Sequence, residues 1–346
     1  MVGAESRLRS DGGGRRLNHV FAGATLLLGL VLLLVGGALL VRGASEIAAG
    51  YGVSPMVVGL TVVAFGTSTP ELVINAIGAS SGATELAFGN VVGSNISNLA
   101  LVLGAAAIMA PIKIQGQLVR REVPLLLLAT TIAAVMALDS PLEQRTALIG
   151  RSDSVVLLLF FCIFLYINVL DFVEARRADP LMAELGDYPL LASHQADTFR
   201  WLLAIGGCVL LFAGGKLTVD SGVELASSFG VSATLIGLFV VAIGTSLPEL
   251  VTSIIAATRG ESDLALGNVV GSNLFNTLVV LPVSGTIHPI EIPDGGLIDL
   301  TMSWVLVALL IPVFYLGKAR LGRLVGSMLI IAYVGYAAIR MMQSPG

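Results

Sequence analysis

The chain has 346 residues, of which 55% are hydrophobic and only 12% are charged, and its formal net charge is −4. A soluble domain carries about twice that charged fraction, so the composition excludes an ordinary water-soluble protein. The small negative charge argues against a nucleic-acid-binding protein. We therefore expect a chain whose surface faces lipid, that is, an all-α integral membrane protein of the cell membrane.

Ten apolar segments are long enough to cross the hydrocarbon core of a bilayer. They lie near residues 20–48, 55–79, 84–109, 121–139, 153–173, 200–228, 232–257, 263–283, 298–316 and 322–342. A polar, Gly- and Arg-rich stretch at 1–18 precedes them, and we expect it to form a disordered tail. The long polar connection at 174–198 predicts a linker between two five-helix halves, 19–173 and 199–346.

One stretch of the sequence occurs twice, with a constant offset of 178 residues. Residues 58–98 and 236–276 are identical at 25 of 41 aligned positions. The repeat contains two motifs, Gly-Thr-Ser-x-Pro-Glu at 66–71 and 244–249 and Gly-Asn-Val-Val-Gly-Ser-Asn at 89–95 and 267–273. Each copy places a carboxyl group, hydroxyl groups and amides in apolar surroundings, which predicts an ion site where two repeats meet.

The number of spans fixes how the two halves are related. Because five is odd, the second half must enter the membrane from the opposite side, so we expect inverted repeats related by a pseudo-two-fold axis in the membrane plane. Lys and Arg in the loops lie mostly on one side of the predicted spans, which places both termini outside. The basic residues of the N-terminal tail favour the opposite orientation.

The first motif predicts a broken helix in the second and seventh spans. Pro70 and Pro248 have no N–H to donate to the carbonyl four residues earlier. Irregular backbone at membrane depth is tolerated where it is buried in protein or lines a wet cavity. The break therefore turns carbonyl oxygens, such as those of Ala64 and Ala242, into potential cation ligands.

The same motif places three polar side chains on one helix face, because residues three and four apart are neighbours on a helix. These residues are Thr67, Ser68 and Glu71 in the first copy and Thr245, Ser246 and Glu249 in the second. A charge in the middle of a spanning helix costs roughly 2.5–3.5 kcal/mol. No Lys or Arg repeats with the two Glu residues, so a cation, or a proton in its absence, is the simplest partner.

The second motif lies in the third and eighth spans, which we also expect to be broken. Its glycines follow a small-xxx-small pattern that allows close helix packing, but packing does not explain the amides. Ser94 and Asn98 share one face, as do Ser272 and Asn276. We interpret Asn98 and Asn276 as cation ligands through their amide oxygens. The other amides, those of Asn90, Asn95, Asn268 and Asn273, are predicted to hold the broken helices.

All of these candidate ligands are oxygen atoms, with no Cys or His among them. Oxygen ligands suit hard cations such as Ca²⁺ and Na⁺ and do not suit soft metals. Two carboxylates balance the charge of one Ca²⁺ ion. Na⁺ in neighbouring subsites would share those ligands, so the two ions would compete, and competition at a site that opens to either side in turn gives exchange.

The doubled motifs resemble the alpha repeats of the calcium/cation antiporter superfamily, specifically the prokaryotic sodium/calcium exchangers. The resemblance covers nearly the whole ten-span layout and implies that Glu71 and Glu249 are the main Ca²⁺ ligands and that the first and sixth helices slide. Asn98 matches the amide of the family at its position, whereas Asn276 replaces an Asp found in relatives. The implied Na⁺ subsites comprise Thr67, Ser68, Thr245, Ser246, Ser94, Ser272 and the carbonyls of Ala64 and Ala242.

The leading hypothesis is a secondary antiporter that exchanges Na⁺ for Ca²⁺ by alternating access. A H⁺/Ca²⁺ antiporter that uses the same Glu pair is a close alternative, and a cation channel is a more distant one. An intramembrane enzyme would need a base such as His or Lys near a Ser, which the motifs lack, so we do not expect an enzyme. We expect a monomer in the lipid bilayer, with transported ions as its ligands and no cofactor.

Overall fold

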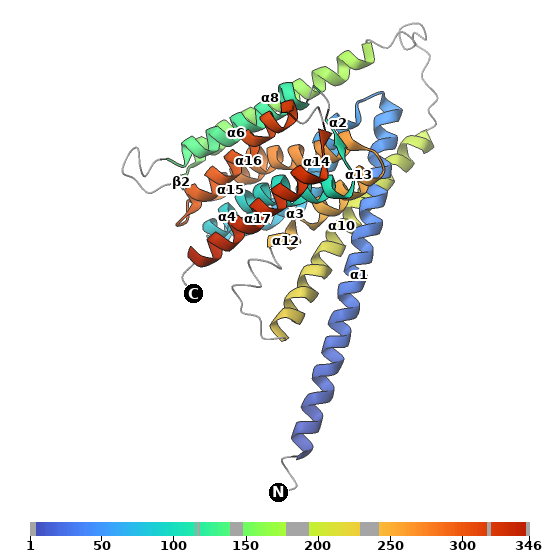
Figure 1. Ribbon diagram of the computed structural model, residues 1–346, viewed down its shortest axis with the longest axis vertical. Helices are drawn as coiled ribbons and strands as arrows, with labels where there is room; N and C mark the ends of the chain where they lie inside the picture. The colour runs from blue at the N-terminus through green and yellow to red at the C-terminus, as the bar shows by residue number, and fades with distance from the viewer. Residues whose placement is uncertain are drawn as a thin grey trace.

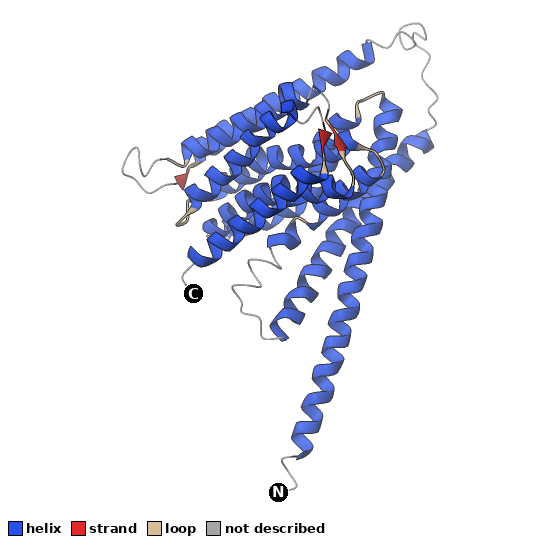
Figure 2. Cartoon of the chain, viewed as in Figure 1, coloured by secondary structure: helices blue, strands red, loops and turns tan. Residues whose placement is uncertain are grey.

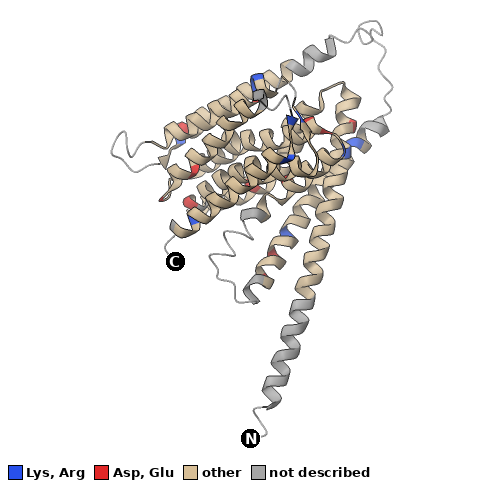
Figure 3. Ribbon diagram, in the orientation of Figure 1, with Lys and Arg blue, Asp and Glu red and all other residues tan. Residues whose placement is uncertain are grey.

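The computed structural model describes residues 5–114, 116, 118–138, 148–177, 194–228, 242–316 and 320–343. Nearly all of this part is helical (Figure 2), and charged residues are sparse along its helices (Figure 3). Eight helical segments of the described part are long and apolar enough to cross a membrane, judged by length and composition. The predicted helical membrane architecture is therefore confirmed, whereas the count of ten spans and the inversion of the repeats stay predictions.

The first half contains a long helix and several shorter ones, some of which change from α- to π-helix. Its elements are α1 (Glu5–Tyr51), α2 (Pro55–Val58), η1 (Gly59–Val63), α3 (Ala64–Ser80), α4 (Thr84–Ile96), η2 (Ser97–Val102), α5 (Leu103–Met109), β1 (Ile112–Lys113), η3 (Leu118–Glu122), α6 (Val123–Met136), β2 (Leu148–Ile149) and α8 (Arg151–Arg177). The start of α2 follows from its sequence. Pro55 occupies the first turn, and the Ser54 hydroxyl accepts the Val57 N–H at 3.3 Å.

The second half repeats this order where it is described. Its elements are α10 (His194–Ser228), α12 (Ala242–Thr245), α13 (Leu247–Thr258), α14 (Ser262–Phe275), η5 (Asn276–Val280), α15 (Leu281–Ile287), β3 (Ile290–Glu291), α16 (Gly296–Leu316), β4 (Arg320–Leu321) and α17 (Arg323–Gln343). The turns before α4 and α14 are alike. Gly82 and Gly260, which are repeat partners, have φ of +80° and +82°, a region that favours glycine.

The helix breaks only partly follow the prediction from the first motif. α3 continues through Pro70 without interruption, so the break predicted at this residue is wrong. Proline removes one backbone hydrogen bond, and the packing of the buried face of this helix outweighs that loss. In the second half, α12 ends at Thr245 and α13 begins at Leu247, so that helix is interrupted. The remaining irregularities are the π-helices η1, η2 and η5.

Three further predictions concern the N-terminal tail, the linker between the halves and the seventh span. α1 begins at Glu5, so helical backbone runs through most of the stretch expected to be a disordered tail. Extending a helix that already exists gains one hydrogen bond for each residue added, which explains this difference. Most of the predicted linker, residues 178–193, lies outside the described part, as do residues 229–241 of the seventh predicted span.

α1 and α10 run side by side along one flank of the molecule, next to a bundle made by the other helices (Figure 1). Glycines allow this close approach: a β-carbon on Gly207 would lie 2.5 Å from the Leu40 backbone nitrogen. At the centre of the bundle lies Ser262–Ile287, whose apolar segment is wholly buried, whereas only 6% of the apolar segment in Arg323–Met342 is buried. The helix that carries the second copy of the amide motif is therefore the innermost one.

Two short antiparallel ladders connect the halves. β1 pairs with β4, with Ile112 opposite Leu321, and β2 pairs with β3, with Ile149 opposite Ile290. Within the repeat, β1 and β3 are equivalent, because Ile112 and Ile290 are 178 residues apart. Each ladder thus joins an element of one half to an element of the other. A two-fold relation between the halves would generate this exchanged pairing.

Candidate ion-binding site

The two acidic motifs lie on α3 and α13, and a hydrogen bond connects them. The Ser68 hydroxyl on α3 donates to Oε1 of Glu249 on α13 at 3.1 Å. Ser68 lies three residues before Glu71, so both side chains project from the same face of α3. Glu71 and Glu249 are each 1% exposed. The tertiary structure therefore brings the two motifs, which are far apart in sequence, into one buried region.

Asn268 on α14 ties this region together. Its Oδ1 accepts a hydrogen bond from the Thr67 hydroxyl at 3.1 Å. Its Nδ2 donates to the Ser253 hydroxyl at 2.9 Å and to the main-chain carbonyl of Glu249 at 3.4 Å. Ser272, one turn after Asn268, lies 3.4 Å from the Thr67 hydroxyl. One amide on the innermost helix thus contacts both acidic helices.

A second group of amides joins α4 to the π-helix η5 and to α14. Nδ2 of Asn95 donates to the Thr277 hydroxyl at 3.0 Å, and Nδ2 of Asn273 donates to the Asn95 main-chain carbonyl at 3.3 Å. These bonds cross between the two halves. Asn95 and Asn273 therefore act as predicted, by holding the irregular helices together.

Several buried oxygen atoms in this region have no hydrogen-bond partner among the described residues. They are Oε1 and Oε2 of Glu71, Oε2 of Glu249, Oγ of Ser94 and Ser246, and Oδ1 of Asn98 and Asn276. A buried polar atom without a partner costs free energy, so such groups normally find one. A hard cation is a partner that carboxylate, hydroxyl and amide oxygens all accept.

The donor set depends on neutral oxygens as well as on acids. Among the described residues, no group of three or more His, Cys, Asp and Glu side chains is arranged to hold a metal ion. Any cation in this region must therefore combine the two carboxyl groups with hydroxyl, amide or carbonyl oxygens. That composition favours Na⁺ or Ca²⁺ over zinc or copper.

The predicted ligands fall into three groups. Those in contact across helices are Thr67, Ser68, Glu249 and Ser272, and the carbonyl of Ala64 accepts the Thr67 hydroxyl at 3.3 Å. Those that are buried with an oxygen lacking a described partner are Glu71, Ser94, Asn98, Ser246 and Asn276. Thr245 is partly exposed, and Ala242 begins α12, with its side chain outside the described part.

Three buried polar residues next to the two Glu residues were missed by the sequence analysis. Asn75 follows Glu71 by four residues and donates to its carbonyl at 2.7 Å. Thr252 and Ser253 follow Glu249 by three and four residues, and both are fully buried. The spacing of three or four from a motif Glu was the available signal, because it predicts a shared helix face.

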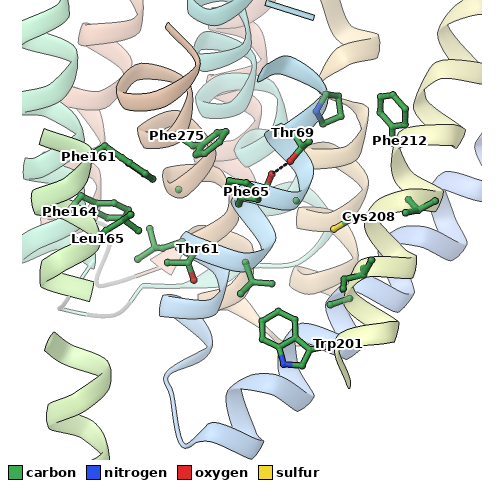
Figure 4. Close-up of a pocket in the computed structure, with 18 residues that line it drawn as sticks. Thr61, Phe65, Thr69, Phe161, Phe164, Leu165, Trp201, Cys208, Phe212 and Phe275 are labelled. Carbon is green, nitrogen blue, oxygen red and sulfur yellow. Dashed lines mark hydrogen bonds between the residues drawn. The ribbon is translucent and has the colours of Figure 1, made fainter. Parts of the chain in front are cut away.

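An apolar cavity of about 630 Å³ lies beside α3, between η1, α8, α10 and α14. Figure 4 shows aromatic side chains around it, including Phe65, Phe161 and Phe275. The hydroxyl of Thr69, which also lines it, donates to the Phe65 carbonyl at 2.6 Å. Thr61 also lines the cavity, and its hydroxyl donates to the Val57 carbonyl at 2.6 Å. Because both hydroxyls already donate to main-chain carbonyls and most of the other lining residues are apolar, the cavity is unsuited to an ion. It is distinct from the oxygen-lined region around the two Glu residues.

The sequence matches a family model described as sodium/calcium exchanger protein over residues 21–170 and 199–342. The sodium/calcium exchanger MaX1 of Methanosarcina acetivorans is 32% identical over 341 residues, which cover 91% of this chain and 97% of that protein. The inner membrane protein YrbG of Escherichia coli is 35% identical over 277 residues, which cover 79% of this chain and 82% of that protein. With eight apolar helices of spanning length among its described residues, this chain is a multi-pass membrane protein.

Solved structures of the sodium-calcium exchanger NCX_Mj are similar over most of the chain. One of them has a TM-score of 0.78 and 30% sequence identity, covering 92% of this chain and 98% of that one. This structure was soaked with Na⁺ and Sr²⁺, and another of the NCX_Mj structures was soaked with Na⁺ and Ca²⁺. The family match covers both copies of the doubled motif, and the structural match covers the bundle that joins them. The chain therefore belongs to the sodium/calcium exchanger protein family.

Proposed function

We propose that this protein is a secondary antiporter that exchanges Na⁺ for Ca²⁺ across the membrane at the site between Glu71 and Glu249. One observation carries the proposal: the Ser68–Glu249 contact joins the acidic motifs of the two halves in a buried region. Two carboxylates there match the charge of one Ca²⁺ ion. Family membership and the likeness to NCX_Mj support the same assignment.

The proposed ligand roles follow the chemistry of the oxygens. Glu71 and Glu249 bind Ca²⁺, and the amide oxygens of Asn98 and Asn276 complete its coordination. Na⁺ occupies adjacent subsites built from the remaining hydroxyl and carbonyl oxygens, namely those of Thr67, Ser68, Ser94, Thr245, Ser246, Ser272, Ala64 and Ala242. Because Ca²⁺ and Na⁺ share the carboxylates, they cannot be bound together, and their competition couples the two fluxes.

The exposure of the site to each side in turn would come from the inverted halves, 19–173 and 199–346. The exchanged pairing of β1 with β4 and of β2 with β3 supports a two-fold relation between them. Each half supplies one carboxyl group, so one chain contains the complete site. We therefore propose that the monomer in a lipid bilayer is the functional unit.

Flux measurements in reconstituted vesicles test this function. An outward or inward Na⁺ gradient should drive Ca²⁺ movement in the opposite direction, and replacing Na⁺ by choline at fixed pH should stop it. Ca²⁺ movement that persists in choline but follows a proton gradient would replace Na⁺ by H⁺ as the coupling ion. Absence of Ca²⁺ movement under both gradients would reject the antiporter, and unitary currents in a planar bilayer would indicate a channel.

A further inference from the structure

The two copies of the site have the same motif residues but different hydrogen bonds. Around Glu249 the bonds are formed: its carboxyl accepts from Ser68, and Asn268 donates to Ser253 at 2.9 Å. We call these four residues, Glu249, Ser68, Asn268 and Ser253, the closed half-site. Its members come from α3, α13 and α14, so closing it fixes three helices against one another.

The equivalent groups around Glu71 are buried and have no described partner. Shifting each closed residue by 178 positions gives Glu71, Ser246, Asn90 and Asn75, which we call the open half-site. Both carboxyl oxygens of Glu71, Oγ of Ser246, Nδ2 of Asn90 and Oδ1 of Asn75 lack hydrogen-bond partners. The Ser68–Glu249 bond and the Asn268–Ser253 bond thus each have a matching donor and acceptor in the open half-site that lack described partners.

Asn75 stands where the other half has Ser253, and its chemistry fits the same task. Its Nδ2 donates to the Glu71 carbonyl at 2.7 Å, which leaves Oδ1 as a buried acceptor, 1% exposed as a residue. Asn90 offers the corresponding buried donor, as Asn268 does for Ser253. An amide oxygen and a hydroxyl oxygen both accept a hydrogen bond from an amide N–H.

We propose that Asn75 and Ser253 are positioning residues of the transport cycle. Each accepts a hydrogen bond from an asparagine amide in one of two alternating states, Asn75 from Asn90 in the third span and Ser253 from Asn268 in the eighth. In the present state Asn268 donates to Ser253. In the opposite state that bond opens, Asn90 donates to Asn75, and Ser246 donates to Glu71. This inference rests on the proposed alternating access and adds the hydrogen bonds that each state exchanges.

The proposed exchange of hydrogen bonds predicts opposite effects for two matched alanine substitutions. Ser253→Ala removes an acceptor used in the present state, so the population should shift about fivefold toward the other state, as expected for loss of one hydrogen bond. Asn75→Ala should shift it about fivefold the other way. Asn75→Ser should restore the wild-type ratio, because a serine hydroxyl can donate to the carbonyl four residues earlier and still accept from Asn90.

Distances between two spin labels would measure the ratio of the two states in the detergent-solubilised full chain. Cys162 and Cys208 are replaced in this protein so that only the introduced sites carry labels. Labels at Leu202 on α10 and Met328 on α17 are suitable because both side chains are exposed. Thr130→Val on α6 is the matched control: it also removes a buried hydroxyl, one bonded at 2.8 Å to the Leu126 carbonyl, and should leave the ratio unchanged. Thermal melting of each variant reports whether it is folded.

Three results would overturn the proposed exchange of hydrogen bonds. They are shifts in the same direction for Ser253→Ala and Asn75→Ala, no shift in either of these variants, and an equally large shift in the Thr130→Val control. Failure of Asn75→Ser to restore the ratio would overturn it as well. Spectroscopy requires no ion transport, and it therefore separates the two proposals. A wild-type protein that fails to move Ca²⁺ in vesicles contradicts the antiporter, whereas only the distance ratios decide the exchange of bonds.

Discussion

Glu71 and Glu249 are buried acids in the interior of a membrane protein, and the side chains recorded in hydrogen bonds beside them are neutral hydroxyls and amides. The Ser68 hydroxyl donates a hydrogen bond to Oε1 of Glu249 at 3.1 Å, and hydroxyl and amide groups lie nearby. An ionised carboxylate in such a place requires a compensating charge. In the proposed function a transported cation supplies that charge, so these two residues, more than the surrounding hydroxyls, should determine transport.

Replacing either acid by its neutral amide tests this requirement. Glu71→Gln or Glu249→Gln should abolish Ca²⁺ transport while the protein stays folded, because the shape is kept and one charge is lost. Vesicle flux and thermal melting measure the two properties. Glu46→Gln is the control: Glu46 is a partly exposed acid that pairs with Arg42 at 2.8 Å, and its loss should leave transport unchanged. Retained transport in either Glu71→Gln or Glu249→Gln would contradict the site.

Asn276 is a proposed ligand at a position where the resemblance to the exchanger family implies Asp. Asn276→Asp adds a carboxyl group to the proposed ligand set, and that group gains a proton as the pH falls. Exchange by the variant should therefore decline toward acidic pH more steeply than exchange by the wild type. Initial flux rates measured over a pH series test this, and superimposable profiles would remove Asn276 from the ligands.

At the scale of elements, the contact between α1 and α10 depends on glycines that let the two backbones touch. Gly36 and Gly207 contribute to it from opposite helices, and each lies close to the backbone of the other helix. The two helices are therefore fitted along their length, and we expect them to behave as one unit.

Adjacent glycines in α10 allow a matched test of this contact. A β-carbon at Gly207 would lie 2.5 Å from the Leu40 nitrogen, whereas one at Gly206 meets nothing within 4 Å among the described residues. Gly207→Ala should destabilise the protein by about 1–3 kcal/mol, the usual cost of overpacking. Gly206→Ala should leave the melting temperature unchanged or raise it slightly, because alanine favours helix. Equal melting temperatures for both variants would disprove the close contact.

At the scale of the whole molecule, the two halves form one body. The β1–β4 and β2–β3 ladders each connect the halves, and Ser68 reaches Glu249 across 181 residues of sequence. Neither half contains both acids, so neither could form the site alone. The function we propose is thus a property of the joined halves.

The predicted ten-span topology has a direct test with reporter tags. A tag before Met1 and another after Gly346 should both be accessible from outside intact cells, and a tag within 178–193 should become accessible only after lysis. This pattern follows from an even total of spans with five on each side of the linker. Terminal tags on opposite sides would exclude an even number of spans, and a linker tag on the same side as the termini would exclude the inverted halves.

Much of the site could be predicted from sequence because helical spacing is local. The face shared by Thr67, Ser68 and Glu71 follows from 3.6 residues per turn, and α3 has that geometry. The break at Pro70 could not be judged in the same way. Proline always removes a hydrogen bond, but whether the helix continues depends on how its neighbours pack, and α3 continues where the second half is interrupted.

The sequence by itself determined the membrane class, the doubled motifs and the oxygen chemistry of the site, because composition and short-range spacing suffice for these. Only the tertiary structure decided that Ser68 bonds to Glu249 while Ser246 has no described partner, and that Asn268 is engaged while Asn90 offers a free donor. The motif residues are the same in both halves, so their local preferences are equal. The difference arises from long-range packing, which places the same side chains in two environments within one chain.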